Sequence, residues 1–201
     1  MKIGPKYKIA RRLGASIFDK TATPKFAASS AKKSKTTRPK AKSQYGTQLN
    51  EKQKARFMYG INERQFGNYV SKALAMKNRK TPDTLYEMLE TRIDNVLYRA
   101  GFASTRQFGR QIVSHGHIVV NGTKVTIPSF KVSMGDVVSI REASSKKKCF
   151  ANLDAVLKEM SFPKWITVDA AKREIKVVDL PVLMPSENMF DVNAIIQYYQ
   201  R

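Results

Sequence analysis

The sequence predicts an α+β protein: a mostly helical N-terminal domain with a basic arm, and an inserted module of two helices plus a small antiparallel sheet. Apolar residues recur every three or four positions from 49 to 101, which is typical of amphipathic helices. The pattern changes to strand-like runs in HIVVNGTKVTI (117–127), around an Asn-Gly pair that favours a hairpin. The first 80 residues hold 21 lysines and arginines against three acids, so they carry +18 of the net +21.

The basic arm occupies residues 1–48. Its stretch 20–48 is rich in Lys, Ser, Thr and Ala and has no apolar periodicity. Such a stretch cannot bury enough surface to offset its ordering entropy, so we expect it to become ordered against phosphates. An organelle transit peptide has a similar composition. However, this stretch is internal and follows the patterned GPKYKIARRLG (4–14), which disfavours that reading.

The helical domain is expected to combine 49–90 with 143–201. One or two helices are predicted in 49–77, since glycines interrupt the apolar stripe. The strongest helix is predicted over 81–101 and ends at a glycine. The C-terminal part is expected to hold a short helix in NLDAVLKEM, a hairpin in PKWITVDAAKREIKVVDL and a terminal helix.

The module is expected to span 91–142. Ser104 and Gln107 fit a capping box that begins its second helix, and Gly116 ends that helix. Asn121-Gly122 predicts a type I′ turn between two strands, and a further strand follows a second turn at 134–136.

Composition excludes several classes of protein. A net charge of +21 indicates a polyanionic partner, either nucleic acid or, as the alternative, an anionic membrane surface. No apolar run approaches the ~18–20 residues that span a bilayer, which excludes an integral membrane protein. The single cysteine, Cys149, excludes an internal disulfide or cysteine-based zinc site and fits a reducing cytoplasm. His115 and His117 have no carboxylate or thiolate nearby in sequence, so no metal site is predicted.

Catalytic motifs are weak in this chain. It contains no GxxxxGK[ST] loop, GxGxxG loop or nucleophile elbow. TRIDN (91–95) resembles the Arg-Leu-Asp stretch of pseudouridine synthases, whose aspartate is the nucleophile, so an RNA-modifying enzyme is the alternative function. Asp94 nevertheless lies within an amphipathic pattern near Glu90 and Arg92, which favours a local charge arrangement. We therefore predict that the chain is not an enzyme.

RNA binding is the better-supported chemistry. Arg106 and Arg110 stand four residues apart and share a helix face with Gln107. The start of this helix offers backbone N–H groups to a phosphate, and arginine offers a planar two-pronged donor. Too few polar side chains follow to read base edges of DNA, whereas RNA is recognised through shape and backbone.

The module resembles the RNA-binding domain named after small-subunit ribosomal protein S four. The resemblance rests on Arg-hydrophobic-Asp at 92–94, GFASTR at 101–106, VSHG at 113–116, VNG at 120–122 and GD at 135–136. The flanks IGPKYKIARRLG, YGTQLNEKQKARFMYGINERQFGNYV, PKWITVD and FDVNAIIQYYQ extend it to the ribosomal protein S four family, most closely its bacterial form. Only about 20–44 and 143–160 match poorly.

The resemblance implies a structural constituent of the small ribosomal subunit. Members of this family are primary binders of the 5′ domain of 16S rRNA; they nucleate 30S assembly and support translational accuracy. They lie beside ribosomal proteins S three and S five, near the channel through which mRNA enters, and some repress translation of their own mRNA. For this chain the resemblance implies no cofactor, no membrane, no homo-oligomer and a cytoplasmic location on the ribosome.

The resemblance also implies a set of rRNA contacts in three segments. They are Lys6, Lys8, Arg11 and Arg12; then Lys52, Lys54, Arg56, Tyr59, Arg64 and Gln65; then Arg92, Asn95, Arg106, Gln107, Arg110, His115, Asn121 and Lys124. Many bacterial members carry a zinc-binding cysteine cluster that begins where this chain has Tyr7 and Ala10. This chain is expected to be a zinc-free variant, whose N-terminal segment is held by packing and RNA.

Overall fold

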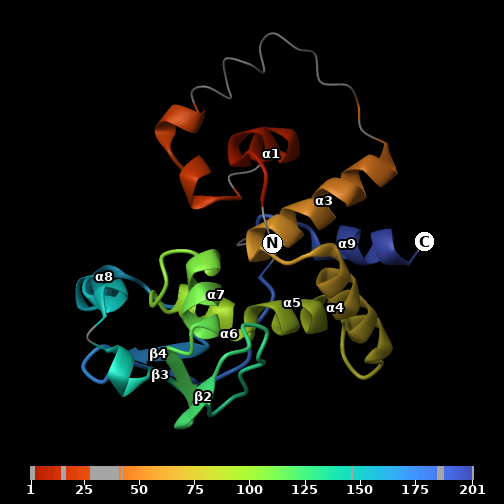
Figure 1. Cartoon of the computed structure of the whole chain (residues 1–201). Helices are drawn as coiled ribbons and strands as arrows, with labels where there is room; N and C mark the ends of the chain where they lie inside the picture. Colours follow the sequence, from red (N-terminus) through yellow and green to blue (C-terminus); the bar gives the residue numbers. More distant parts are fainter. Residues whose placement is uncertain are drawn as a thin grey trace. The chain divides into compact units, whose positions relative to one another are not determined.

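The computed structural model of the chain describes residues 3–14, 17–27, 41, 43–145, 147–184 and 188–200 (Figure 1). The chain forms two compact units. Unit 1 comprises residues 1–85 and 183–201, and unit 2 comprises residues 86–182. Within the described ranges, no helix has both the length and the apolar character needed to cross a membrane.

Unit 1 is built from helices wherever the structure describes regular elements in it. These are α1 (Lys6–Leu13), the 3-10 turn η1 (Asp19–Thr21), α3 (Gln44–Tyr59), α4 (Glu63–Ala75), the first half of α5 (Thr81–Glu90), and α9 (Val192–Tyr199). The predicted helical stretch 49–77 is therefore two helices. Gly60, with φ of 64°, ends α3, and the Asn62 side chain caps α4 by accepting from the Gln65 backbone N–H.

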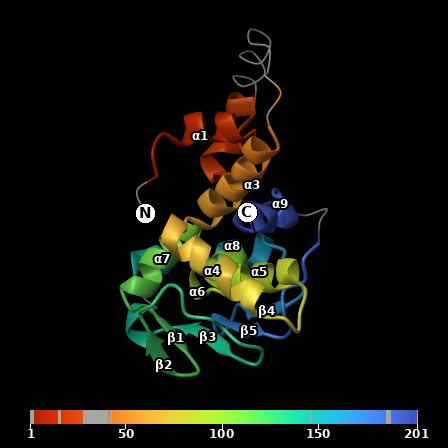
Figure 2. The same ribbon diagram turned by 90° about the vertical axis from the view of Figure 1, so that its right-hand side faces the viewer.

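The core of unit 1 lies where α3 and α9 run side by side (Figures 1 and 2). The rings of Tyr59 and Phe190 meet edge to face, with centroids 6.2 Å apart. A second cluster of Ala10, Phe18 and Phe26 packs against Phe57 and so attaches α1 to α3. The apolar spacing of the sequence is thus used for helix packing.

Unit 2 combines helices with one sheet. Its elements are the second half of α5, α6 (Ile93–Arg99), α7 (Arg106–Ser114), β1 (Ile118–Val120), β2 (Thr123–Val125), β3 (Val137–Ile140), η2 (Glu142–Ser144), η3 (Lys148–Phe150), α8 (Leu153–Glu159), β4 (Ile166–Asp169) and β5 (Glu174–Val177). The strands form an antiparallel sheet in the order β2-β1-β3-β5-β4. Figure 1 shows α6 and α7 on one side of this sheet. Their buried Val96, Leu97 and Ile112 join Val138 and Ile175 of the sheet in one core.

The C-terminal hairpin lies in a different unit from the one that the sequence predicted. Residues 143–182 were expected to join the helical domain, but β5 pairs with β3, with Val138 opposite Ile175. Leu153 and Leu157 of α8 enter the same core. Without the hairpin, the edge of β3 opposite β1 would leave a row of backbone groups unpaired, and β5 pairs them. Alternation in the sequence predicts a hairpin but does not say which strand it will join.

The predicted single helix over 81–101 is broken into α5 and α6. Arg92 forms an antiparallel bridge with Lys131, and the Val132 N–H donates to the Thr91 carbonyl at 2.9 Å. The Ile93 N–H donates to the Phe130 carbonyl, also at 2.9 Å. The backbone here pairs with the loop before β3, and the helix is interrupted for that reason. This is tertiary structure overriding helix propensity.

The turns around α7 agree with the sequence except at the cap. Thr105, and not Ser104, caps α7, because its side chain accepts from the Phe108 N–H at 3.1 Å. Gly116 follows the helix with φ of 70°. Asn121 and Gly122 have φ of 49° and 79°, which confirms a turn with two left-handed residues.

Candidate RNA-binding surface

The position of α7 depends on a close approach to α6. A Cβ built on Gly109 would lie 2.7 Å from the backbone oxygen of Asp94, so only glycine fits there. Ile112 and Val113 face the core. Gln107 is exposed, while Arg106 and Arg110 are half-buried, so the predicted face does carry these three side chains at the surface.

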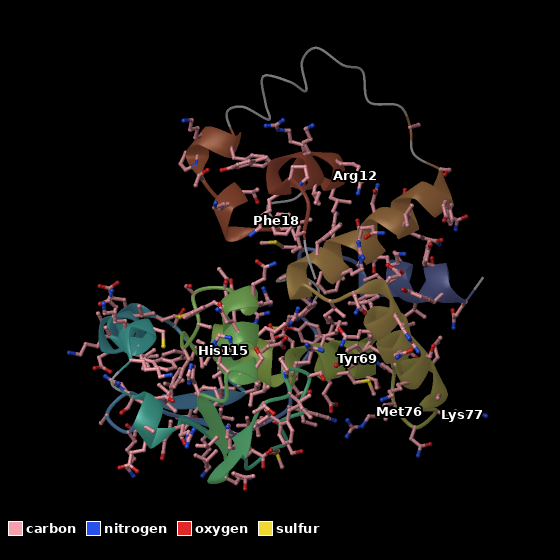
Figure 3. The ribbon with its side chains drawn as sticks, in the orientation of Figure 1. Arg12, Phe18, Tyr69, Met76, Lys77 and His115 are labelled. Carbon is pink, nitrogen blue, oxygen red and sulfur yellow. The ribbon has the colours of Figure 1, made fainter. Side chains whose placement is uncertain are left out.

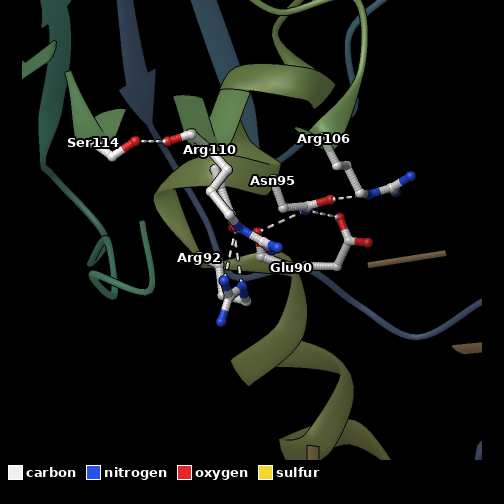
Figure 4. Close-up of polar contacts among 7 residues, drawn as sticks. Glu90, Arg92, Asn95, Arg106, Arg110 and Ser114 are labelled. Atoms are coloured by element: carbon white, nitrogen blue, oxygen red, sulfur yellow. Dashed lines mark hydrogen bonds and ion pairs between the residues drawn. The ribbon is translucent and has the colours of Figure 1, made fainter. Parts of the chain in front are cut away.

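Arg110 is held by a buried carboxylate (Figure 4). Asp94 is 2% exposed and pairs with the guanidinium groups of Arg92 and Arg110, both of which Figure 4 labels. Arg110 donates to its Oδ2 through Nε at 3.1 Å and through Nη2 at 2.8 Å. Arg92 donates through Nε to Oδ1 at 3.0 Å and through Nη2 to Oδ2 at 2.7 Å. Both oxygens of Asp94 therefore accept hydrogen bonds from arginine side chains within the protein.

A second buried carboxylate supports Arg106 indirectly. Glu90 is fully buried and accepts from Arg99 through two bonds of 2.9 Å. It also accepts from the Asn95 Nδ2 at 2.9 Å. The Oδ1 of Asn95 in turn accepts from the Nε of Arg106 at 2.7 Å, and the Arg106 guanidinium lies 4.3 Å from the centroid of the Tyr98 ring. A chain of bonds thus runs from the core to α7.

The end of α7 carries the histidines. His115 is exposed (Figure 3), and its ring centroid lies 5.9 Å from that of His117. The Nδ1 of His117 lies 3.0 Å from the Ser144 hydroxyl. Burial lowers the pKa of His117, and the charge of Lys147 lowers this pKa further. Of the two rings, His115 is therefore the more exposed.

The hairpin of β1 and β2 carries both of its predicted residues at the surface, and one of them is also bonded within the protein. The Asn121 Nδ2 donates to Asp136 at 2.8 Å, and its Oδ1 accepts from the Val137 N–H at 2.9 Å. Its amide therefore fixes the turn against the loop before β3 and is engaged within the protein. Lys124 is exposed and passes close to Gly116, next to the end of α7.

In unit 1, α1 presents the predicted cations of the start motif. Lys8, Arg11 and Arg12 are exposed, and Figure 3 labels Arg12 on this helix. Lys6 is half-buried, with its Nζ 5.6 Å from the centroid of the Phe18 ring. α1 is therefore a basic face that rests on an aromatic cluster.

Two of the predicted contacts on α3 are buried instead. Lys52 is 4% exposed, pairs with Glu63 at 2.7 Å and lies 4.5 Å from the centroid of the Tyr198 ring. Tyr59 is 2% exposed against Phe190. A side chain in this position has no surface to offer RNA.

The other predicted residues on α3 and α4 are partly or fully exposed. Lys54 and Arg56 are half-buried and pair with Glu51 and Glu63, at 2.6 and 3.5 Å. Arg64 and Gln65 are exposed in the first turn of α4.

Arg92 and Asn95 complete the corrections, since both are buried in the networks beneath α7. The predicted contacts that are buried are thus Lys52, Tyr59, Arg92 and Asn95, and their side chains contact other protein side chains.

The prediction omitted one exposed basic run. Lys77, Arg79 and Lys80 are exposed in the turn between α4 and α5, and Lys77 is labelled in Figure 3. The density of positive charge in KNRK (77–80) was the sequence signal that could have found them.

Known protein families match most of the chain. The family model described as "Ribosomal protein S4/S9 N-terminal domain" matches residues 1–90, and that described as "S4 domain" matches residues 91–138. A relative from Chromobacterium violaceum, called small ribosomal subunit protein uS4, is 41% identical over 99% of this chain and 98% of its own length. This chain belongs to the uS4 family. Other uS4 relatives, from Laribacter hongkongensis and Neisseria meningitidis serogroup C, are 40% and 42% identical, over 98% and 99% of the chain and 98% of their own lengths.

Membership of the uS4 family fits the two units. The boundary between the two matched regions, at residues 90 and 91, lies close to the boundary between unit 1 and unit 2 at residues 85 and 86. The uS4-type RNA-binding domain therefore corresponds to the part of unit 2 that contains Asp94, α7 and the hairpin. Among the described residues, no group of three or more His, Cys, Asp or Glu side chains is placed to hold a metal ion.

Proposed function

We propose that this chain is a structural, non-catalytic protein of the small ribosomal subunit that binds 16S rRNA. The observation that carries the proposal is similarity to small ribosomal subunit proteins along 99% of the chain, at 41% identity. The net charge of +21 supports it, because neutralising phosphates and releasing their counterions is the main source of affinity for RNA.

The finer role that we propose is primary binding of the 5′ domain of 16S rRNA, which nucleates assembly of the subunit. Ribosomal proteins S three and S five, and mRNA near the channel through which it enters, are the proposed neighbours. Support for translational accuracy would follow from that location. These proposals rest on the resemblance of the N-terminal and C-terminal motifs to the bacterial family.

The proposed contacts are the predicted residues that the structure leaves partly or fully exposed. They are Lys6, Lys8, Arg11, Arg12, Lys54, Arg56, Arg64, Gln65, Arg106, Gln107, Arg110, His115, Asn121 and Lys124. Lys77, Arg79 and Lys80 are added to them. Guanidinium groups can meet a phosphate through two parallel N–H donors, which gives them geometric selectivity that a lysine lacks.

A binding titration tests the proposal. The full chain is titrated against a transcript of the 5′ domain at several salt concentrations, with a 3′-domain transcript and a random-sequence RNA of equal length as controls. If about 6–10 phosphates are contacted, the logarithm of the binding constant should fall with the logarithm of salt at a slope of about −5 to −9. The 5′ domain should bind more tightly than both controls at every salt concentration. Equal affinity for the three RNAs, or a slope near zero, would show that the proposal is wrong.

A further inference from the structure

Two of the few acidic residues of this chain are buried directly beneath the arginines of α7. The chain has only 16 acids against 37 basic residues, yet Glu90 and Asp94 are 0% and 2% exposed. Burying a carboxylate is costly, and a buried ion pair is often no more stabilising than apolar side chains of the same volume. Stability alone therefore gives a weak reason for placing Asp94 there, and its partners indicate another.

We propose that Asp94 is a positioning residue for RNA binding: its carboxylate fixes the guanidinium of Arg110 at the surface before RNA arrives. The proposal rests on the RNA-binding function proposed above. Arg110 reaches Asp94 through both Nε and Nη2, at 3.1 and 2.8 Å, while its side chain remains 25% exposed. Two bonds to one carboxylate define the plane of the guanidinium as well as its position.

The rest of the network makes Asp94 a fixed base for this contact. Arg92 is 3% exposed and holds the other side of the same carboxylate with bonds of 3.0 and 2.7 Å. The close approach at Gly109 brings α7 against the Asp94 backbone. In parallel, Glu90 acts through Asn95 on Arg106, one helical turn before Arg110. Two guanidinium groups on α7 are thus oriented from below.

The benefit for binding is that less side-chain freedom is lost when a phosphate is bound. Immobilising one long side chain weakens an association by roughly 3- to 10-fold, and pre-organisation avoids this loss. Simple electrostatics predicts the opposite effect for Asp94, because removing an acid makes the protein more positive and should tighten RNA binding. The sign of the effect therefore distinguishes a positioning role from a purely electrostatic one.

The experiment compares two full-length variants that change the charge equally. Asp94→Asn removes the buried carboxylate, and Glu159→Gln removes an exposed one at the end of α8. Affinity for the 5′-domain transcript is measured over a range of salt. We expect Asp94→Asn to bind roughly 3- to 10-fold more weakly than wild type with an unchanged salt slope, and Glu159→Gln to bind equally or slightly more tightly. Asp94→Asn binding as tightly as Glu159→Gln would overturn the proposal.

Folding is checked by the fluorescence of Trp165, the only tryptophan, which is buried in unit 2.

Arg110→Lys keeps the positive charge but loses the planar fork, and it replaces Asp94→Asn as the test if that variant does not fold. We expect it to weaken binding roughly 3- to 10-fold at an unchanged slope, whereas Arg110→Gln should also make the slope shallower by about 0.7–0.9. Unchanged affinity of Arg110→Lys would contradict the proposal.

Asp94→Asn and Arg110→Lys are also combined in one double variant. If Asp94 acts through Arg110, the loss caused by Arg110→Lys should be much smaller in the Asp94→Asn background, and fully additive losses would count against the proposal. A failure of the proposed function is seen separately, because the wild-type chain itself would then show no preference for the 5′ domain.

Discussion

The pair formed by Lys52 and Glu63 shows how a predicted RNA contact can be a folding contact. Lys52 is buried, whereas the Glu63 side chain is 48% exposed and also accepts from the Tyr199 hydroxyl at 3.0 Å. Partial burial raises the pKa of Glu63, but the hydrogen bonds from Lys52 and Tyr199 outweigh it, so the pKa lies below its ordinary value of 4.5. The ionised form of Glu63 is therefore favoured by folding.

A pH dependence follows from the lowered pKa of Glu63. Its contribution to stability is present above about pH 4.5 and is lost as the pH falls through the lower pKa of the folded state. Glu63→Gln should cost about 0.5–1 kcal/mol at pH 7, a modest value because the carboxylate is half exposed. The difference between variant and wild type should shrink on acidification to pH 3. Thermal unfolding followed by circular dichroism at both pH values measures this, with Glu159→Gln as the charge control. A difference that stays constant with pH would contradict it.

At the level of single residues, the sequence predicted which face of a helix a side chain occupies, but not whether that side chain is buried. The spacing of four residues placed Arg106 and Arg110 on one helix face, and they are found there. It could not show that Lys52, Arg92 and Asn95 are buried, because the segments that cover them are brought there by tertiary packing. Arg92 pairs with Asp94 two residues later, and the same carboxylate also accepts from Arg110 of another helix.

Among the elements, the contact between α6 and α7 is the most sensitive to side-chain size. Gly109→Ala would place a Cβ 2.7 Å from the Asp94 carbonyl oxygen, and a backbone atom cannot move aside as the end of a side chain can. We expect a loss of about 1–3 kcal/mol in the free energy of unfolding, as in other overpacked cores. Urea unfolding followed by Trp165 fluorescence measures it.

The control for that change is a glycine in a helix with open space. A Cβ on Gly67 in α4 would meet only the Cε1 of Tyr199, at 3.8 Å, which is an ordinary contact. Gly67→Ala should therefore be neutral or stabilise by up to about 1 kcal/mol, since alanine favours helices. Circular dichroism compares the two variants. Losses of equal size in the two variants would show that the close approach of α7 to α6 is not what makes Gly109→Ala costly.

The elements themselves were largely predictable, and their pairing was not. The Asn121-Gly122 turn, α8 and the hairpin of β4 and β5 have local signals and were confirmed. The break between α5 and α6 depends on hydrogen bonds to residues 130 and 132, about 40 positions away. The addition of β5 to β3 likewise depends on an edge of the sheet that exists only once the module has folded.

Across the whole molecule, attraction and geometry are divided between the two units. Unit 1 contains 22 basic and 6 acidic residues, a net charge of +16, whereas unit 2 contains 15 and 10, a net charge of +5. Arg106 and Arg110, whose guanidinium groups are hydrogen-bonded to buried side chains, lie in unit 2. The salt-dependent part of RNA binding is therefore expected to come mainly from unit 1, and the selectivity for RNA shape mainly from unit 2.

This division gives a prediction for charge removal in each unit. Arg11 and Arg12 are exposed at the end of α1. Changing both to glutamine should weaken RNA binding and make the salt slope shallower by about 1.4–1.8, since each contacted phosphate contributes about 0.7–0.9. The matched control changes two exposed lysines of unit 2, Lys158 and Lys172, to glutamine. Because neither is a proposed contact, its slope should stay at the wild-type value although the net charge falls equally. Filter binding of the 5′-domain transcript from 50 to 300 mM salt compares the variants. If both pairs lowered the slope alike, total charge would govern binding, and the assignment of the contacts to α1 would be wrong.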